Sequence, residues 1–214
     1  MHQGTFITFE GPEGAGKTSV LAVLAERLRE QGYVVCKTRE PGGVAIAEQI
    51  RDVILNRENI KMDAKTEALL YAAARRQHLV EKVIPALERG ELVLCDRFVD
   101  ASLVYQGMAR QIGIEQVLDV NTFAIDGVMP SLTLLFDLPP EVGLARIEAH
   151  KGREVNRLDL EGLAFHRRVR EGYLGLVNRF PERIKLIRAD QSFEIVCEAA
   201  WNSITQHMKK RNKR

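Results

Sequence analysis

One eight-residue stretch near the N-terminus constrains the fold of this chain more than any other feature. It follows the apolar residues 5–9 and reads Gly11-Pro12-Glu13-Gly14-Ala15-Gly16-Lys17-Thr18. The two fixed glycines and the Lys-Thr pair match a phosphate-binding loop, in which backbone amides cradle phosphate, the lysine reaches the β- and γ-phosphates and the threonine hydroxyl binds Mg²⁺. Leu21, Leu24 and Leu28 then recur on one helical face. The stretch predicts a strand, a loop that binds ATP and a helix, in preference to an ordinary glycine-rich turn.

Length and composition indicate a single globular domain. The chain has 214 residues, of which 45% are hydrophobic and 28% charged, with a net charge of +2. This balance gives no electrostatic reason for binding nucleic acid or a membrane surface. Residue 1 leads directly into a predicted strand and no apolar run reaches about 18 residues, so we expect a cytoplasmic location. The three cysteines, Cys36, Cys95 and Cys197, lack metal-ligand spacing and are expected to be reduced structural thiols.

Five apolar runs separated by helical patterns predict a parallel, doubly wound α/β sheet with helices on both faces. The runs cover residues 5–10, 33–38, 91–96, 132–137 and 183–187. Between the second and third runs we predict helices over residues 47–55 and 66–88, with a kink at Pro85. The apolar side of the longer helix is expected to carry Leu69, Ala73, Val80, Ile84 and Leu87.

Polar residues follow the first three strands, at the edge where a parallel sheet binds ligands. They are Glu10 with the loop, the run from Thr38 to Gly43, and Asp96 with Arg97. An aspartate that ends an apolar strand is placed to bind the Mg²⁺ of a phosphate-loop nucleotide, although such an aspartate can also cap the next element. The Arg97 guanidinium suits bidentate phosphate binding, with a surface ion pair as the alternative.

Two further sets of residues have both a functional and a structural interpretation. Tyr71 and Arg75 are spaced i, i+4, so they share a helix face and can stack on and bond a planar base; a core tyrosine beside a solvated arginine is the alternative. The segment of residues 150–159 is dense in charge and includes Arg153 and Arg157 around Gly152. It is either a solvated turn or a basic lid that closes on the transferred phosphate.

Several blocks together resemble thymidylate kinases of the bacterial type. The blocks are Phe9-Glu10-Gly11, Thr38-Arg39-Glu40-Pro41-Gly42-Gly43, Glu67-Ala68-Leu69-Leu70-Tyr71-Ala72-Ala73-Ala74-Arg75, Asp96-Arg97-Phe98, Tyr105-Gln106-Gly107 and Asn156-Arg157-Leu158-Asp159. The resemblance runs from about residue 6 to residue 190. It implies the nucleoside-monophosphate kinase fold, phosphorylation of dTMP to dTDP with ATP and Mg²⁺, and a homodimer.

The resemblance also implies roles for individual residues. Tyr71 stacks on thymine and Arg75 bonds its carbonyl, while Glu13 faces the deoxyribose 3′-hydroxyl. Arg39, Arg51 and Arg97 form the monophosphate pocket, Tyr105 and Gln106 line the sugar and base, and the turn Arg188-Ala189-Asp190 resembles an adenine-side loop. Lys17, Arg97, Arg153 and Arg157 are the implied catalytic residues, with Thr18 and Asp96 at the metal.

Departures from the family pattern bear on base selection and on the source of catalytic charge. Ala101 stands where many members have a serine near thymine, Phe98 replaces a tyrosine, and Tyr71 replaces a phenylalanine. Gly14 stands where one branch of the family carries an arginine, so the sequence resembles the branch in which Arg153 and Arg157 of the lid supply that charge.

The sequence thus predicts one kinase domain over residues 1–214, with a core of residues 1–149 and 160–208, a lid at about residues 150–159 and a basic tail at residues 209–214. The tail is expected to be a frayed, solvated helix end. Two alternatives remain at this point. One is a kinase for dCMP, UMP or AMP, and the other is a phosphate-loop protein that acts as an ATP-dependent switch.

Overall fold

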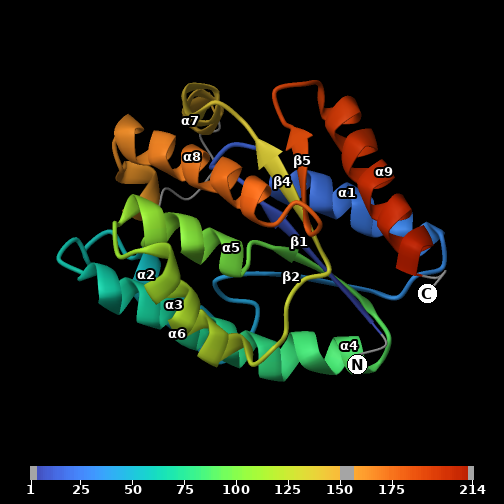
Figure 1. Ribbon diagram of the computed structural model, residues 1–214, viewed down its shortest axis with the longest axis horizontal. Helices are drawn as coiled ribbons and strands as arrows, with labels where there is room; N and C mark the ends of the chain where they lie inside the picture. The colour runs from blue at the N-terminus through green and yellow to red at the C-terminus, as the bar shows by residue number, and fades with distance from the viewer. Residues whose placement is uncertain (1–3, 150–156, 212–214) are drawn as a thin grey trace.

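The computed structural model describes residues 4–149 and 157–211. In these residues five parallel strands form one sheet in the order β2-β3-β1-β4-β5, with helices on both faces (Figure 1). The strands are β1 (Thr5–Glu10), β2 (Val35–Arg39), β3 (Leu92–Asp96), β4 (Leu132–Asp137) and β5 (Ile184–Arg188). The helices are α1 (Lys17–Glu30), α2 (Ala45–Leu55), α3 (Ala64–His78), α4 (Ile84–Glu88), α5 (Val99–Ser102), α6 (Ile114–Ile125), α7 (Pro140–Ala149), α8 (Leu163–Arg179) and α9 (Phe193–Arg211). The predicted parallel α/β sheet is confirmed, and the bounds of β1 and β4 match the predicted runs.

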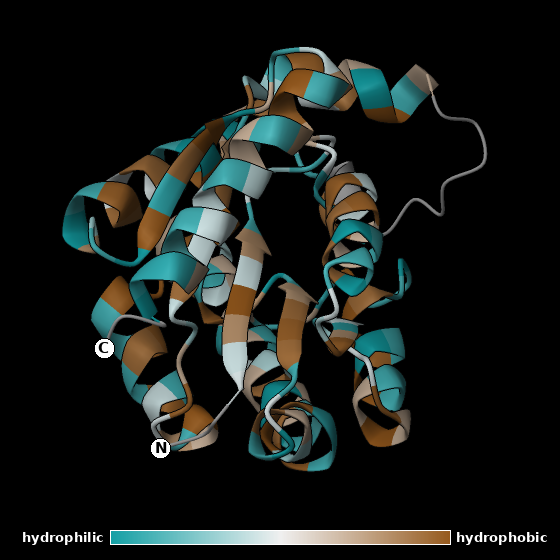
Figure 2. Ribbon diagram, turned by 90° about the vertical axis from the view of Figure 1, so that its right-hand side faces the viewer, coloured by the Kyte–Doolittle hydropathy of each residue, from teal (hydrophilic) through white to brown (hydrophobic). Residues whose placement is uncertain are grey.

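Alternate residues of the central strands separate two hydrophobic layers, because successive side chains of a strand point to opposite faces. Ile7 and Leu94 face α1 and α9 in one cluster, whereas Phe6 and Val93 face the π-helical and α-helical segments of residues 79–88 and the end of α6 in another. A third cluster joins α8 and residues 103–109 to Leu135. Figure 2 shows the helices banded in teal and brown, which is typical of elements that bury one face.

The two edge strands, β2 and β5, have fewer buried side chains than their predicted apolar runs suggest. Only the first and fourth side chains of β2 and of β5 are buried, and the others are exposed or half-buried. Cys36 on β2 is therefore half-buried, whereas Cys95 and Cys197 are buried, and all three are free thiols.

The predicted helix of residues 66–88 is interrupted before Pro85. After α3, a π-helical turn η1 (Leu79–Val83) leads into α4, and the Ile84 amide donates to the Leu79 carbonyl five residues earlier. Proline has no amide proton and cannot continue the α-helical pattern, so a break here is expected.

The predicted apolar side of this helix is wrong in its first part. Leu69, Ala73 and Val80 are exposed, whereas Ala68 and Ala72 are buried. The small alanines let α3 pack closely on its neighbours, α2 and α6, and the larger apolar residues are left outside.

A second π-helical segment, η2 (Leu103–Ala109), follows α5 directly. Its hydrogen bonds join an amide to the carbonyl five residues earlier, where an α-helix joins residues four apart. One example is the 2.8 Å bond from the Arg110 amide to the Tyr105 carbonyl. Such segments are frequent at functional sites. This one carries two predicted site residues, Tyr105 and Gln106.

The predicted lid lies largely outside the described residues, as does Arg153. The described chain ends α7 at Ala149 and resumes with a 3₁₀ turn, η3 (Arg157–Leu160). Of the predicted basic tail, residues 209–211 continue α9, and Arg211 donates to the Thr5 hydroxyl, so this part of the tail is not frayed. None of the helices in residues 4–149 and 157–211 combines the length and apolar character that crossing a bilayer requires.

Candidate active site

The phosphate-binding loop joins β1 to α1 at the carboxyl edge of the sheet. Its glycines adopt positive φ angles of 140° at Gly11, 74° at Gly14 and 79° at Gly16, which side chains larger than hydrogen rarely allow. Lys17 Nζ donates to the carbonyls of Gly11 (2.9 Å) and Pro12 (2.8 Å). The lysine therefore lies across the inside of the loop that it is predicted to serve.

Gly14 also has a steric role. A Cβ at this position would lie 2.3 Å from the carbonyl oxygen of Gly143 in α7, and a Cβ at Gly143 would lie 2.3 Å from the carbonyl oxygen of Glu13. An arginine at position 14 would thus require α7 or the loop to move. This contact is consistent with a helper arginine supplied from elsewhere in the chain.

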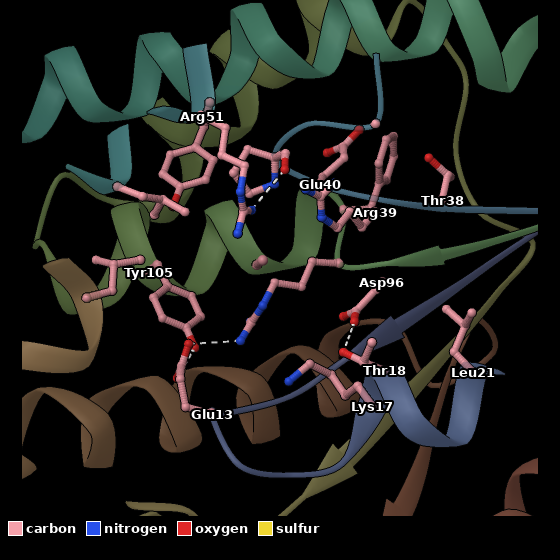
Figure 3. A pocket seen from close by; sticks show the side chains of 18 of the residues that line it. Glu13, Lys17, Thr18, Leu21, Thr38, Arg39, Glu40, Arg51, Asp96 and Tyr105 are labelled. Atoms are coloured by element: carbon pink, nitrogen blue, oxygen red, sulfur yellow. Dashed lines mark hydrogen bonds and ion pairs between the residues drawn. The ribbon is translucent and has the colours of Figure 1, made fainter. Parts of the chain in front are cut away.

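Thr18 and Asp96 meet at the start of α1. Asp96 ends β3 beside Phe9 of β1, and the Thr18 hydroxyl donates to Asp96 Oδ2 (Figure 3). Both side chains offer oxygen, the ligand that Mg²⁺ prefers. No group of three or more metal-binding His, Cys, Asp or Glu residues occurs in the described chain. A cation here would therefore take few protein ligands, as is usual for Mg²⁺ bound with nucleotide phosphates.

Burial weakens the charge of Lys17. Desolvation, together with the positive charge of Arg97, lowers the pKa of Lys17 to about 8, against the opposing effects of Asp96 and Glu13. Among the described residues no carboxylate contacts the buried ammonium directly, so a polyphosphate that entered the loop would supply a counter-charge.

Glu13 and Tyr105 lie across the cleft from Arg51 (Figure 3), and together with Arg97 they form a tight cluster. Arg97 Nη2 donates to Glu13 Oε1 at 2.9 Å and the Tyr105 hydroxyl donates to Glu13 Oε2 at 2.6 Å. Burial acts to raise the pKa of Glu13, but Arg97 and Lys17 outweigh it and the pKa is lowered. The carboxylate is thus ionised and held from both sides.

Glu10 fixes the turn that presents Arg97. Arg97 has a left-handed φ of 69°, which is rare for a non-glycine residue, and the Phe98 amide donates to Glu10 Oε1 at 2.7 Å. The Tyr173 hydroxyl donates to Glu10 Oε2 at 2.9 Å and accepts from Arg97 Nη1 at 3.1 Å. Burial, aided by the nearby Asp100, raises the pKa of Glu10 to about 8.

Tyr71 and Arg75 both line the cleft, as their spacing predicts. The alternative of a core tyrosine beside a solvated arginine is wrong, because the arginine is the more buried of the two. Arg75 is only 2% exposed and Tyr71 is half-buried. The Arg75 guanidinium donates to Glu40 (2.7 Å), to Ser102 (3.2 Å), and to the Asn121 side chain and the Phe98 carbonyl. Its plane is therefore fixed before any base arrives.

The two other predicted phosphate-pocket arginines come from the second strand's tip and from α2. Arg39 makes a bidentate pair with Glu48 (2.7 and 3.1 Å), and Arg51 Nη1 donates to the Pro41 carbonyl at 3.0 Å. Both line the same cleft. The Arg39 side chain is half-exposed and paired with a carboxylate, so binding a phosphate would require it to exchange partners.

Gln106 and Arg157 meet at a carboxylate that the motif analysis left without a role. Glu67 Oε1 accepts from Gln106 Nε2 at 2.8 Å and Glu67 Oε2 accepts from Arg157 Nη2. Arg157 Nε also donates to the Ile54 carbonyl at 3.1 Å, and the side chain is buried. In this structure Arg157 thus bonds to α2 and α3.

One cavity of about 1050 Å³ brings most of the predicted residues together. It is lined by both phosphate-loop and acceptor-side residues, among them Gly14, Gly16, Lys17, Thr18, Asp96, Glu13, Arg39, Arg51, Tyr71, Arg75, Arg97, Tyr105 and Gln106. Gly11, Pro12, Ala15 and Arg157 do not line it. This volume lies at the upper end of the range for small-molecule pockets.

The comparisons with known proteins agree with this geometry. The thymidylate kinase family model matches residues 9–200. The chain belongs to the thymidylate kinase family. A thymidylate kinase from Bacillus pumilus is 61% identical over 207 residues, covering 97% of this chain and 98% of that one, and a thymidylate kinase from Geobacillus thermodenitrificans is 62% identical over 193 residues, covering 90% and 86%. The crystal structure of a thymidylate kinase from Ehrlichia chaffeensis superposes with a TM-score of 0.76 at 30% identity, covering 94% of this chain and 98% of that one.

Several polar residues that shape the site of this thymidylate kinase family member had no role predicted from the sequence, although Glu40 and Glu67 stand in the matching blocks. They are buried side chains that hold the cleft residues in place, namely Glu40, Glu67, Ser102, Asn121, His166 and Tyr173. His166 and Tyr173 are seven residues apart on α8, a spacing that places two polar groups on one buried helix face. That spacing is a usable signal, but it identifies no partner.

The predicted adenine-side turn lies beside the phosphate-binding loop. Arg146 of α7 donates to the Ala189 carbonyl at 3.2 Å and to the Gly14 carbonyl at 3.4 Å, and Arg188 pairs with Asp190. The turn after β5 and the loop after β1 are therefore joined by one side chain.

Proposed function

We propose that this chain transfers the γ-phosphoryl group of ATP to dTMP and forms dTDP. The observation that carries the proposal is the shared cavity, in which the phosphate-binding loop faces a cluster suited to a nucleoside monophosphate. Membership of the thymidylate kinase family supports dTMP as the acceptor. An ATP-dependent switch would not need Arg51, Tyr71 and Arg97 in the same cavity as the phosphate-binding loop.

The proposed roles follow from position and charge. Lys17 and the loop amides bind the β- and γ-phosphates of ATP, and Arg97 binds the phosphate of dTMP beside the transferred group. Glu13, held by Arg97 and Tyr105, accepts a hydrogen bond from the sugar hydroxyl. Tyr71 stacks on the base, and Arg75 and Gln106 bond its edge.

The reaction needs no general base. A phosphate monoester has a second pKa of about 6, so the attacking oxygen of dTMP is already anionic at neutral pH. Holding two mutually repelling anions in line and neutralising the charge of a loose transition state is therefore the main task of the protein. Arg97 lies in the cavity for this, and Arg153 and Arg157 remain the proposed lid arginines. Arg157 would first have to leave Glu67.

Thr18 and Asp96 would hold Mg²⁺, which neutralises phosphate charge when bound. Their oxygens converge at the mouth of the loop, and the Thr18 hydroxyl now donates its proton to Asp96. The hydroxyl oxygen could ligate the cation through a lone pair while its O–H continues to donate a hydrogen bond to Asp96 Oδ2.

We also propose that the protein is a cytoplasmic homodimer. Exposed apolar side chains on three helices that contact one another support a subunit interface: Ile46 and Val53 on α2, Leu69 on α3, and Phe123 on α6, which is 91% exposed. A dTMP kinase that supplies DNA synthesis would work in the cytoplasm.

A coupled ADP-release assay tests the catalytic proposal. Purified protein with ATP and Mg²⁺ is given dTMP, dUMP, dCMP, UMP or AMP, and we expect dTMP to be strongly preferred. Release that depends on another monophosphate would replace the acceptor, and release that depends on none would remove the kinase assignment.

A further inference from the structure

Glu67 lies behind the base-facing wall of the cleft and touches residues from two separate segments. It is 1% exposed in the first part of α3. Gln106 of η2 donates to it at 2.8 Å, Arg110 donates through Nε at 3.4 Å, and Arg157 of η3 donates to its other oxygen. In all three contacts the side-chain nitrogen is the donor and the Glu67 carboxylate is the acceptor.

An acceptor at this position determines the orientation of the Gln106 amide. An amide group can offer either its NH₂ or its oxygen to a neighbour, and these ends differ only in which way the group is turned. Because the Glu67 oxygen accepts in this contact, the NH₂ end of Gln106 faces Glu67. The oxygen end is then the part of Gln106 that this contact leaves available on the cleft side.

We infer that Glu67 is a positioning residue for base selection, because it holds Gln106 with its amide oxygen available to the base. This inference rests on the proposed dTMP kinase function. A carbonyl oxygen pairs with the N3–H of an imide base such as thymine or uracil. It opposes the N3 lone pair of cytosine, and two facing acceptors are unfavourable.

The substitution Glu67→Gln tests this with almost no change in shape. A glutamine at position 67 replaces one carboxylate oxygen by NH₂. Its oxygen is expected to stay toward Arg157, which donates at closer range than Arg110, so the NH₂ faces Gln106 and the more distant Arg110 Nε. Gln106 then turns its oxygen toward position 67 and its NH₂ toward the cleft. We expect the ratio of kcat/KM for dTMP to that for dCMP to fall at least tenfold, mainly through KM.

The matched control is Glu161→Gln. Glu161 pairs with Arg110 at 2.6 Å from the outer side of the same cluster but is not bonded to Gln106 in the structure. This variant should keep the wild-type ratio. An equal fall in both variants would mean that loss of charge, and not amide orientation, changes the selectivity, and would overturn the inference.

The exchanged pair Glu67→Gln with Gln106→Glu provides the decisive rescue. The carboxylate moves to position 106, accepts from the glutamine at position 67 and still presents an oxygen to the base, while the charge of the cluster is unchanged. Its dTMP-to-dCMP ratio should return toward that of the wild type, even if the single variant does not fold. An unchanged ratio in Glu67→Gln, or a ratio near one in the exchanged pair, overturns the inference. The proposed function fails separately, if the wild-type chain does not phosphorylate dTMP.

Discussion

The Lys17 side chain is buried inside the phosphate-binding loop, and burial together with Arg97 lowers its pKa to about 8. Its charge is fully present well below pH 8 and is lost as the pH rises through that value. An ATP site that relies on this charge should therefore weaken in mildly alkaline solution.

We predict that the Kd for ATP rises several-fold between pH 7 and pH 9, measured by calorimetry. The Glu10→Gln variant serves as the control, since Glu10 is a second group near Lys17 with a pKa of about 8, and the rise should persist in it. A flat Kd over this range in the wild-type protein would show that Lys17 keeps its charge.

Glu10 affects stability in the opposite sense from a salt-bridged carboxylate. Burial, with the nearby Asp100, raises its pKa from 4.5 to about 8 in the folded protein. The folded chain therefore holds a proton that the unfolded chain releases near pH 4.5. Its contribution makes the free energy of unfolding fall as the pH rises from about 4.5 to about 8.

We predict that Glu10→Gln is more stable than the wild-type chain at pH 8, by on the order of 1 kcal/mol or more, and that the difference shrinks toward pH 4.5. The glutamine oxygen can still accept from the Phe98 amide, and its NH₂ can donate to the Tyr173 hydroxyl. Urea unfolding at several pH values measures this. Glu30→Gln, at an exposed site on α1, should not alter the pH profile, and a similar profile for both variants would contradict the assignment.

At the scale of elements, the contact between α7 and the phosphate-binding loop sets the loop's shape. We predict that Gly143→Ala lowers kcat at least tenfold, because the added methyl would lie 2.3 Å from the Glu13 carbonyl and the loop must shift. The assay is ADP release with dTMP, alongside a thermal unfolding measurement.

Gly175→Ala on α8 is the matched control, since its added methyl meets nothing within 4 Å. It should keep full activity and stabilise the fold by about 0.5–1 kcal/mol, because alanine favours helix. Equal activity in both variants would show that the loop tolerates a displaced α7.

The elements differ in how far the sequence determines them. The strands β1 and β4 were predictable because buried strands of a parallel sheet are continuous apolar runs with sharp ends. The prediction that Leu69 lies on the buried side of its helix was wrong, because helical spacing shows which residues share a face but not whether that face is buried. The alanines of α3 carry the buried face because they allow close packing, and alanine gives little hydrophobic signal.

The residues of the site also differ in whether the sequence predicts their positions. Lys17, Thr18 and Asp96 could be placed together because the phosphate-loop motif and the strand order fix where they lie. Glu67 and Tyr173 could not, because their partners are 39 or more residues away in the chain and no local pattern records such contacts. The pairing of Arg157 with Glu67 was missed for this reason, since motif spacing indicates position but not the direction of a side chain.

At the scale of the whole molecule, the exposed apolar side chains on α2, α3 and α6 predict association. We expect Leu69→Asp to shift the protein from dimer to monomer in sedimentation velocity experiments, because a buried carboxylate at a subunit interface is costly. Ile195→Asp on α9 is the control, as Ile195 and Leu69 are both 56% exposed. A wild-type monomer, or dissociation by both substitutions alike, would contradict an interface on these helices.

The strand order has a consequence for how the protein is made. The phosphate-binding loop follows β1, the first strand to leave the ribosome, yet β1 lies between β3 and β4, where Ile7 pairs with Leu94 and Leu132. Synthesis proceeds from the N-terminus, and pairing of distant segments is slow. More than half of the chain must therefore be translated before β1, the strand that precedes the loop, can pair with both β3 and β4. Chains that terminate early would contain the whole motif but lack the sheet that holds it.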